Sequence, residues 1–399
     1  MKTQPFGLPS LFLCGWCLAC GETEEPAQPA RAPQVVSVAA GDDHTCALFD
    51  DGSVKCWGAA EHGRLGSGDV ENRGDQPGEM GDALPVVELG SGRRAVALDA
   101  GGAHTCAILD DATMKCWGSA YAGRNGSGDE YDNRGDQPGE MGDALPPLEL
   151  GTGRTVTAVS AGFAHSCALL DDGSVKCWGH GSFGQLGQGD LEHRGDQPGE
   201  LGDALPAIEL GSGHTALAVA AAADHSCALL DDGSVKCWGG NPRGQLGLGD
   251  TNDRGDEPGE MGDTLLAADL GDRRPLAVSA GGNHTCVLLE GGRVECFGAS
   301  FAGVLGQGAV TEIGDDTVPS AHLGDEPGEM GDALPAVDLG VGKSTLAISA
   351  GTRHNCALLA DHSVKCWGDA TDGQLGLGDD ETRGDAPGEM GDALPALGL

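Results

Sequence analysis

The sequence predicts an all-β fold, a β-propeller of six four-stranded blades, from three observations. One unit recurs six times, and the first cysteines of successive copies are 60, 61, 60, 59 and 70 residues apart. Each copy contains four short apolar segments rich in strand formers. Gly is abundant, with 70 residues in 399, whereas aromatic residues make up only 4%. Because repeats of this length stack side by side, we expect one body rather than several domains.

The centre of each copy predicts a β-hairpin closed by a disulfide. The runs His-x-Cys-Ala-Leu and Ser-Val-Lys-Cys-Trp-Gly flank Asp-Asp-Gly, a turn sequence. If the turn is centred on Asp51, Cys46 lies directly opposite Cys56, and opposed residues of an antiparallel pair are close enough for a disulfide. We therefore expect six such bonds, joining Cys46 to Cys56, Cys106 to Cys116, Cys167 to Cys177, Cys227 to Cys237, Cys286 to Cys296 and Cys356 to Cys366.

Two further segments complete the expected four-stranded blade. In the third copy they are Val159–Gly162 and a Leu-Pro segment, Leu205–Leu210. The first copy has no Leu-Pro segment before Val35, and the last copy ends in one, Leu394–Leu399. We therefore expect the C-terminal strand to pair with the first blade, which would close the ring and remove an exposed sheet edge.

The N-terminus predicts export. Residues 1–19 combine an early Lys with an apolar stretch that is too short to span a bilayer, as in a signal peptide. The following Cys20 completes Leu-Ala-Cys-Gly, which resembles a bacterial lipoprotein processing site and implies a lipidated Cys20. A plain secretory signal is the alternative. Residues 20–34 then form a polar, Pro-rich tether, and residues 35–399 form the propeller. The expected location is the cell envelope, as an outer-membrane lipoprotein facing the periplasm or the surface, or the secreted fraction.

The charge balance excludes nucleic acid as a partner. The chain has 23 Lys and Arg against 62 Asp and Glu, a net charge of -39, and such a surface repels phosphate and anionic lipid. We therefore expect contact with a membrane only through the lipid anchor, and a soluble, monomeric body with a solvated surface.

The motifs His-Thr-Cys-Ala-Leu, Asp-Asp-Gly-Ser-Val-Lys-Cys-Trp-Gly and Gly-Gln-Leu-Gly-x-Gly resemble the RCC1 repeat family (regulator of chromosome condensation). The resemblance covers residues 35–399. It implies a β-propeller that serves as a binding platform, and the family includes a nucleotide exchange factor and an exported inhibitor of β-lactamases. The chain departs from familiar members in having six repeats instead of seven, in its paired cysteines, which fit an oxidising compartment, and in its leader.

Two patterns raise the question of metal binding. Each copy has a His two residues before its first Cys, at positions 44, 104, 165, 225, 284 and 354. His-x-Cys with a second Cys could form half of a zinc site, although six identical structural bonds are the simpler interpretation. The acidic loop that follows Gly68 could supply oxygen ligands to Ca²⁺, but its spacing matches no known calcium loop. We predict no cofactor and no metal, with Ca²⁺ as the weaker alternative. An Arg-Gly-Asp tripeptide in five copies is interpreted as a product of repeat duplication.

Specificity is expected where the copies differ. They vary most in the four residues after Trp-Gly, in the pair before each His, and in an insertion at residues 309–321. Loops on a rigid scaffold and aromatic or Arg side chains are the usual anchors of protein interfaces. The candidate partner surface comprises Tyr121, Phe163, Phe183, Arg243, Phe301 and Arg353.

The sequence contains no nucleophile elbow, phosphate loop or HExxH motif, so we predict a protein-binding scaffold and no enzyme. The alternatives are a propeller enzyme acting on polysaccharide and, by family analogy, an exchange factor.

Overall fold

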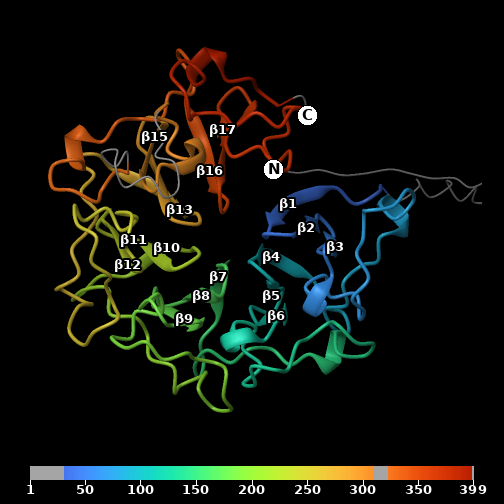
Figure 1. Cartoon of the computed structure of the whole chain (residues 1–399). Coiled ribbons are helices and arrows are strands. Elements are labelled where there is room, and N and C mark those ends of the chain that lie inside the picture. The colour runs from blue at the N-terminus through green and yellow to red at the C-terminus, as the bar shows by residue number, and fades with distance from the viewer. Residues whose placement is uncertain (1–30, 309–321, 398–399) are drawn as a thin grey trace, which may run out of the picture. The chain divides into compact units, whose positions relative to one another are not determined.

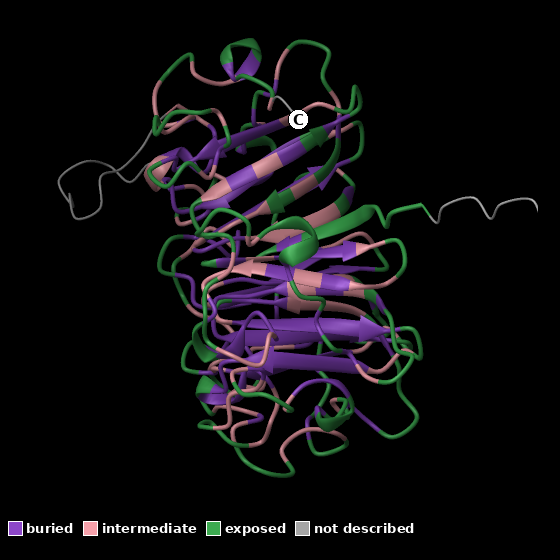
Figure 2. Ribbon diagram, turned by 90° about the vertical axis from the view of Figure 1, so that its right-hand side faces the viewer, coloured by how far each residue is buried: buried purple, intermediate pink, exposed green. Residues whose placement is uncertain are grey.

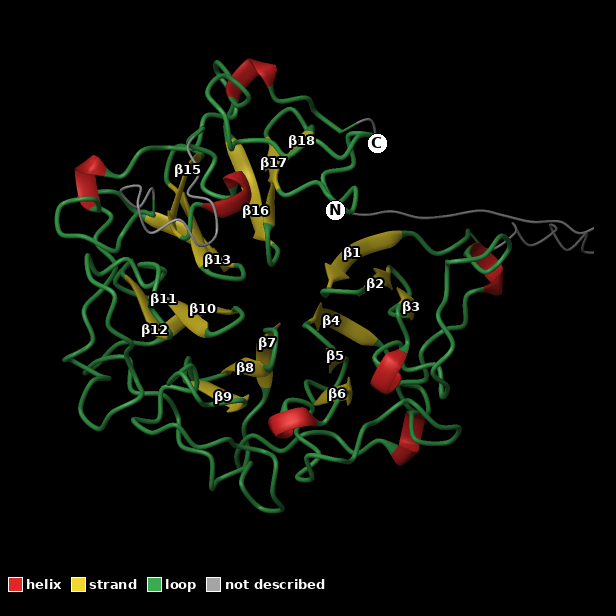
Figure 3. Cartoon of the chain, in the orientation of Figure 1, coloured by secondary structure: helices red, strands yellow, loops and turns green. Residues whose placement is uncertain are grey.

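The computed structural model describes residues 31–308 and 322–397. The expected signal peptide, Cys20, most of the tether and the insertion at 309–321 lie outside the described residues. The chain separates into two units, residues 1–33 and Gln34–Leu399, and all the strands belong to the second. This second unit is an all-β propeller with six antiparallel sheets (Figures 1 and 3).

Each sheet has three strands in sequence order, and we number the blades 1 to 6 along the chain. The inner strands are β1 (Val35–Ala40), β4 (Ala95–Ala100), β7 (Val156–Ala161), β10 (Ala216–Ala221), β13 (Pro275–Ala280) and β16 (Thr345–Ala350). The middle strands are β2 (His44–Phe49), β5 (His104–Leu109), β8 (His165–Leu170), β11 (His225–Leu230), β14 (His284–Leu289) and β17 (His354–Leu359). The outer strands are β3 (Val54–Gly58), β6 (Met114–Gly118), β9 (Val175–Gly179), β12 (Val235–Gly239), β15 (Arg293–Gly298) and β18 (Val364–Gly368).

The described helices are single 3₁₀ turns in the connections. They are η1 (Glu61–Gly63), η2 (Gly81–Ala83), η3 (Tyr121–Gly123), η4 (Gly142–Ala144), η5 (Phe301–Gly303), η6 (Gly331–Ala333) and η7 (Gly391–Ala393). In the part of the chain that the structure describes, no helix has the length and apolar character needed to cross a membrane.

The predicted hairpin and its disulfide are confirmed in every repeat. In the first blade Cys46 of β2 lies opposite Cys56 of β3, and the tight turn between the strands places Gly52 at a φ of 79°, which favours glycine. The Cα atoms of the bonded cysteines are 4.0–4.1 Å apart in the six disulfides. The register of each hairpin therefore brings the two sulfur atoms together without help from another repeat.

The predicted fourth strand is wrong, because the Leu-Pro segment makes only one backbone bond to its own blade. In the first repeat the Val87 N–H donates to the carbonyl of Val54 over 2.8 Å. Leu84, Val87 and Leu89 are buried, so the segment is held mainly by its apolar side chains. Its proline has no N–H to contribute to a ladder, which explains why a regular strand does not form.

The predicted closure of the ring is also wrong. The Leu397 N–H donates to the carbonyl of Val364 over 2.8 Å, so the described part of the C-terminal segment stays on blade 6 and repeats the contact of Val87 with Val54. At the inner rim, the Thr352 hydroxyl donates to the Asp42 carboxylate over 2.8 Å. The strands of blades 6 and 1 do not pack on each other as those of other neighbouring blades do (Figure 1).

The hydrophobic core lies between successive blades. One side of each sheet, here called the disulfide face, carries the cysteines and aliphatic residues such as Leu48 and Val54. The other side, the indole face, carries residues such as Ala107 and Trp117, and it packs on the disulfide face of the preceding blade. Trp117, Trp178, Trp238, Trp367 and the equivalent Phe297 are fully buried in this way. Figure 2 shows the resulting pattern of largely buried strands and exposed connections.

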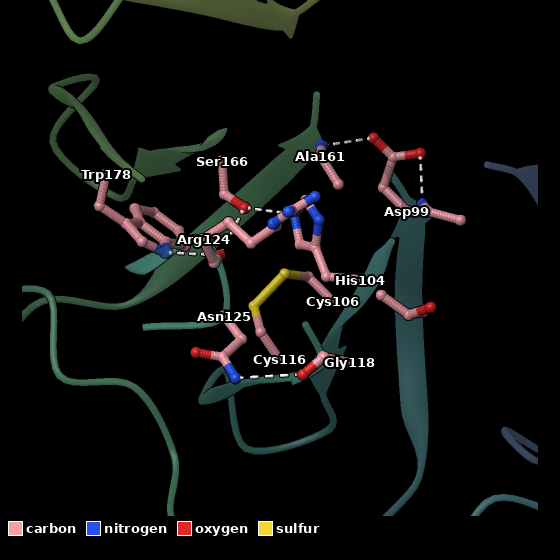
Figure 4. Close-up of a disulfide and its surroundings, with 12 residues drawn as sticks. Asp99, His104, Cys106, Cys116, Gly118, Arg124, Asn125, Ala161, Ser166 and Trp178 are labelled. Carbon is pink, nitrogen blue, oxygen red and sulfur yellow. Dashed lines mark hydrogen bonds between the residues drawn. A yellow bond between two sulfur atoms is a disulfide. The ribbon is translucent and has the colours of Figure 1, made fainter. Parts of the chain in front are cut away.

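A histidine links each of these interfaces. The Nε2 atom of His104 lies 2.7 Å from the Ser166 hydroxyl of the next blade, beside the disulfide of its own blade (Figure 4). The equivalent distances are 2.8 Å for His44 to Thr105, His165 to Ser226, His225 to Thr285, and His284 to Asn355. Five interfaces thus share one contact, which we call the interblade bond.

The second partner of each hydroxyl assigns the histidine tautomer. The Ser166 hydroxyl donates to the Arg124 carbonyl over 3.1 Å, and the Trp178 indole N–H donates to the same carbonyl over 3.1 Å. The Ser166 oxygen must therefore accept its bond from an Nε2–H of His104. Asn355 gives the same result, because its Nδ2 donates to the Val304 carbonyl while its Oδ1 faces His284. Each of the five histidines thus donates from Nε2, and burial lowers its pKa and keeps the ring neutral.

The disulfide of the last blade should be the first to be reduced. Five disulfide faces are covered by a following blade, whereas Cys356 on blade 6 is only partly buried. Mild reduction followed by alkylation and mass spectrometry should label Cys356 and Cys366 first, because reduction requires access of the attacking thiolate or phosphine. Earlier labelling of Cys167 and Cys177, which are fully buried, would contradict this assignment of the covered faces.

The interblade histidines should make the protein sensitive to mild acid. Burial lowers the pKa of His165 and His225 to about 3 and of His44 and His284 to about 4, from the ordinary 6.5. Between pH 6.5 and 4 the unfolded chain binds protons that the folded chain does not, so the free energy of unfolding falls as pH falls. Each histidine contributes about 1.4 kcal/mol per pH unit in this window.

Guanidinium unfolding at pH 7 and pH 5 measures this dependence. A His165→Gln variant should be less stable than the parent at pH 7 but should lose less stability on acidification, since it has one fewer group to protonate on unfolding. His62→Gln, at an exposed position, is the matched control and should behave as the parent. An equal loss in the parent and in His165→Gln would contradict the assignment.

Candidate binding surface

The zinc half-site considered for His-x-Cys is excluded by the geometry of the same residues. The cysteine sulfur atoms are bonded to each other, and five histidines use Nε2 for the interblade bond. Zinc is bound by thiolate sulfur and by a free imidazole nitrogen. Among the described residues, one other group could supply three ligands to a metal, namely His214, Asp231 and Asp232, which are exposed. His214 and Asp231 are 3.2 Å apart and pair with each other.

The acidic loop that we considered for Ca²⁺ is organised by its own side chains. Arg73 pairs with Asp69 over 2.7 Å, and the Glu79 carboxylate accepts the backbone N–H groups of Gly74 and Gln76 at 2.9 and 3.1 Å. The pair recurs as Arg194 with Asp190, Arg254 with Asp250, and Arg383 with Asp379. The arginine of the Arg-Gly-Asp tripeptide therefore has a structural use in these four repeats, whereas Arg134 of the second repeat pairs with Asp132 and the fifth repeat has Leu323 in its place.

The variable loops of blades 2 and 3 bring three of the predicted surface residues together. The ring of Tyr121, at the start of η3, stacks on His180 with centroids 6.2 Å apart, and His180 lies 6.0 Å from Phe183. The Arg124 guanidinium lies 5.1 Å from the centre of the Tyr121 ring and donates to the Phe163 carbonyl over 3.0 Å. Two loops distant in sequence are thereby joined at one place.

His193 completes this cluster, with its ring 4.8 Å from that of His180. We call the cluster the aromatic surface; its members are Tyr121, His180, Phe183 and His193, and Phe163 is joined to it only through its backbone carbonyl, which accepts from Arg124. Tyr121, Phe163 and Phe183 are 53%, 50% and 42% exposed, although large apolar side chains usually avoid solvent. Exposed aromatic side chains gathered in one place are typical of protein interfaces.

The aromatic surface carries little charge in a strongly acidic chain. Partial burial, together with the nearby His193 and Arg124, lowers the pKa of His180, so its imidazole is neutral at neutral pH. Burial also lowers the pKa of Arg124 to about 10, which leaves its guanidinium protonated. An aromatic area with one cation beside it can be desolvated by a partner at less cost than carboxylates.

The other three predicted residues lie on separate blades and do not join this surface. The Arg243 guanidinium lies 3.3 Å from His322, and Arg353 pairs with Asp369 over 3.0 Å. Phe301 begins η5 and is half-buried. The sequence argument missed His180, His193 and Arg124. His180 lies in one of the variable four-residue segments, so the variation between repeats pointed to its position. Nothing in the sequence indicated that Arg124 and His193 lie next to it.

Comparison with known proteins agrees with the geometry of the blades. The family model for the RCC1-like domain matches residues 10–394. The Ultraviolet-B receptor UVR8 of Arabidopsis thaliana is 27% identical over 402 residues, covering 90% of this chain and 82% of the receptor.

Two solved structures share the fold. Yeast RCC1 (Prp20) bound to Kap60 has a TM-score of 0.64 at 21% identity and covers 88% of this chain and 74% of Prp20. Prp20p from Saccharomyces cerevisiae, described with its binding to Gsp1p and histones, has a TM-score of 0.62 at 20% identity and covers 88% and 76% of the two chains. The chain belongs to the RCC1-like domain family.

Proposed function

We propose that the chain is an exported, lipid-anchored scaffold that binds a protein partner through the aromatic surface. The observation that carries this proposal is the gathering of Tyr121, His180 and Phe183 on a rigid pair of blades. The rigidity matters because fixed aromatic side chains lose little conformational entropy on binding. Relatives in this family whose structures are described with Kap60 or Gsp1p bind protein partners, which supports the class of function but not the identity of the partner.

The compartment is part of the same proposal. Six disulfides between cysteines of one repeat persist only where thiols are not continuously reduced, which favours a location outside the cytoplasm. With these twelve cysteines paired, Cys14, Cys17 and Cys20 of the leader are the remaining ones in the sequence. Cleavage before Cys20 would leave one cysteine for acylation and none to mispair.

Removing the aromatic surface should abolish partner recovery without unfolding the protein. The full chain with Tyr121→Ala and Phe183→Ala should recover at least about tenfold less of its partner from envelope extract, because central aromatic side chains commonly contribute about 2 kcal/mol each. Tyr131→Ala is the matched control, since Tyr131 is 84% exposed and has no ring contact with the cluster. Equal recovery by the double variant and the control would contradict the proposed surface.

Lipidation should depend on Cys20 alone. Expression in a bacterial host with labelled palmitate should label the parent, and Cys20→Ser should remove the label and release the protein from the membrane fraction. Cys17→Ser should remain labelled and membrane-bound. An unlabelled parent chain found in the soluble secreted fraction would indicate a plain secretory signal and reject the anchor.

A further inference from the structure

The two ends of the row of blades expose the faces that are buried everywhere else. Blade 6 has a disulfide face with no following blade, and blade 1 has an indole face with no preceding blade. In each of the five internal interfaces these same two faces are joined by the interblade bond and by apolar packing. The internal interfaces therefore show which side chains fit against each of the two exposed faces.

The disulfide face of blade 6 is open. Leu358 is 36% exposed, whereas its five counterparts, Leu48, Ile108, Leu169, Leu229 and Leu288, are 3–6% exposed. His354 is the sixth interblade histidine. Among the described residues, the Nε2 atom of His354 has no hydrogen-bond partner. The carbonyl of Gln374 also has none in the described chain, although the equivalent carbonyl of blade 2, that of Arg124, accepts from Ser166 and Trp178. The Gln374 carbonyl and the Nε2–H of His354 are thus the acceptor and the donor with which blade 6 could form a further interblade contact.

The indole face of blade 1 is also exposed and lacks the hydrogen bonds that this face makes in the other blades. Trp57 is partly exposed, although its counterparts in the other five blades are fully buried. Val35 and Val38 are 53% and 57% exposed, whereas Ala95 and Leu98 at the same positions of blade 2 are 4% and 9% exposed. Within the described chain, the Thr45 hydroxyl and the Trp57 indole N–H make no hydrogen bond of the kind made by Thr105 and Trp117.

The internal interfaces argue against direct contact between these two faces. The interblade distances agree within 0.1 Å, from 2.7 to 2.8 Å, so the rotation from blade to blade is set by one repeated geometry. Blades 6 and 1 meet through Thr352 and Asp42, whereas Leu358 of blade 6 and Trp57 of blade 1 remain accessible to solvent. We call the space between these two accessible faces the wedge. Closing this wedge would distort five packed interfaces at once, and packed interiors resist continuous deformation.

We propose that the wedge between blades 6 and 1 binds a β-hairpin of another polypeptide that has the side-chain chemistry of one repeat. One face of that hairpin presents a hydroxyl and an indole to His354, Gln374 and Leu358. The other presents aliphatic side chains and an imidazole to Thr45 and Trp57. The site does not include the aromatic surface, so the molecule has a second, independent place for a protein partner.

A peptide copied from this chain provides the probe. Residues 165–179 form the hairpin of blade 3, and the Cys167–Cys177 disulfide closes it. In the synthetic peptide, Ser166 and Trp178 would face blade 6, and His165 would face blade 1. Calorimetric titration of the full, disulfide-intact chain should show saturable one-to-one binding. The fluorescence of Trp57, the one described Trp that is partly exposed, should change in parallel, and Trp57→Phe should reduce the change to the contribution of Trp178 in the peptide.

Two variants locate the site. Leu358→Asp should weaken peptide binding at least tenfold, whereas Leu346→Asp should leave it unchanged, because Leu346 is 53% exposed at a position that is also exposed in blades 1 and 2 as Val36 and Val96. A peptide with Trp178→Ala should also bind at least tenfold more weakly, which tests the indole without altering the protein.

Three results would overturn the proposal. The first is the absence of saturable binding, which would mean that the wedge is closed or does not accept a hairpin. The second is binding that Leu358→Asp does not weaken, because the peptide would then occupy another place. The third is self-association of the chain without peptide, detected by light scattering and abolished by Leu358→Asp, because the occupant would then be a second copy.

Discussion

The neutral histidine that donates across each blade interface is the constraint on which the rest of the propeller depends. Its Nε2–H donates to a hydroxyl or amide of the next blade, and that group in turn donates to a backbone carbonyl. In four of the five interfaces the same carbonyl also accepts a tryptophan indole N–H. The bond therefore sets the spacing and rotation of neighbouring blades. The disulfide beside it holds the two strands in register, so the apolar faces meet in the same way at every interface.

This constraint also explains which positions are the same in all repeats and which positions vary between them. The residues of the interblade bond and of the disulfide recur because they hold neighbouring blades or the two strands of one hairpin together. The Arg–Asp pair of the acidic loop holds the connection in four of the repeats. The partner surface that we propose uses positions that none of these contacts needs. Tyr121, His180 and Phe183 occupy such positions, and a rigid scaffold holds them in place although they belong to different repeats.

The sequence was most informative where the interactions are local. The position of Asp51 between two strand-forming runs was enough to place Cys46 opposite Cys56, because strand register depends only on the turn. The fourth strand and the closure of the ring were predicted wrongly. Both depend on where a Pro-containing segment lies in three dimensions. The sequence alone does not determine whether Leu397 pairs with Val364 or with the first blade, and the structure shows the bond to Val364.

The same limit applies to the site. Variation marked Tyr121, Phe163 and Phe183, but only the folded chain shows that Arg124 and His193 lie beside them while Arg243, Phe301 and Arg353 do not.

Histidine-selective nitrogen NMR across pH 7 to 5 is the most direct measurement of the interblade bond. The chain has 12 histidines, and five of them make this bond. We expect five imidazoles that carry their proton on Nε2 and stay neutral at pH 5, because burial lowers the pKa of each. Titration of all the histidines near pH 6.5, or a proton on Nδ1 in the buried five, would contradict it.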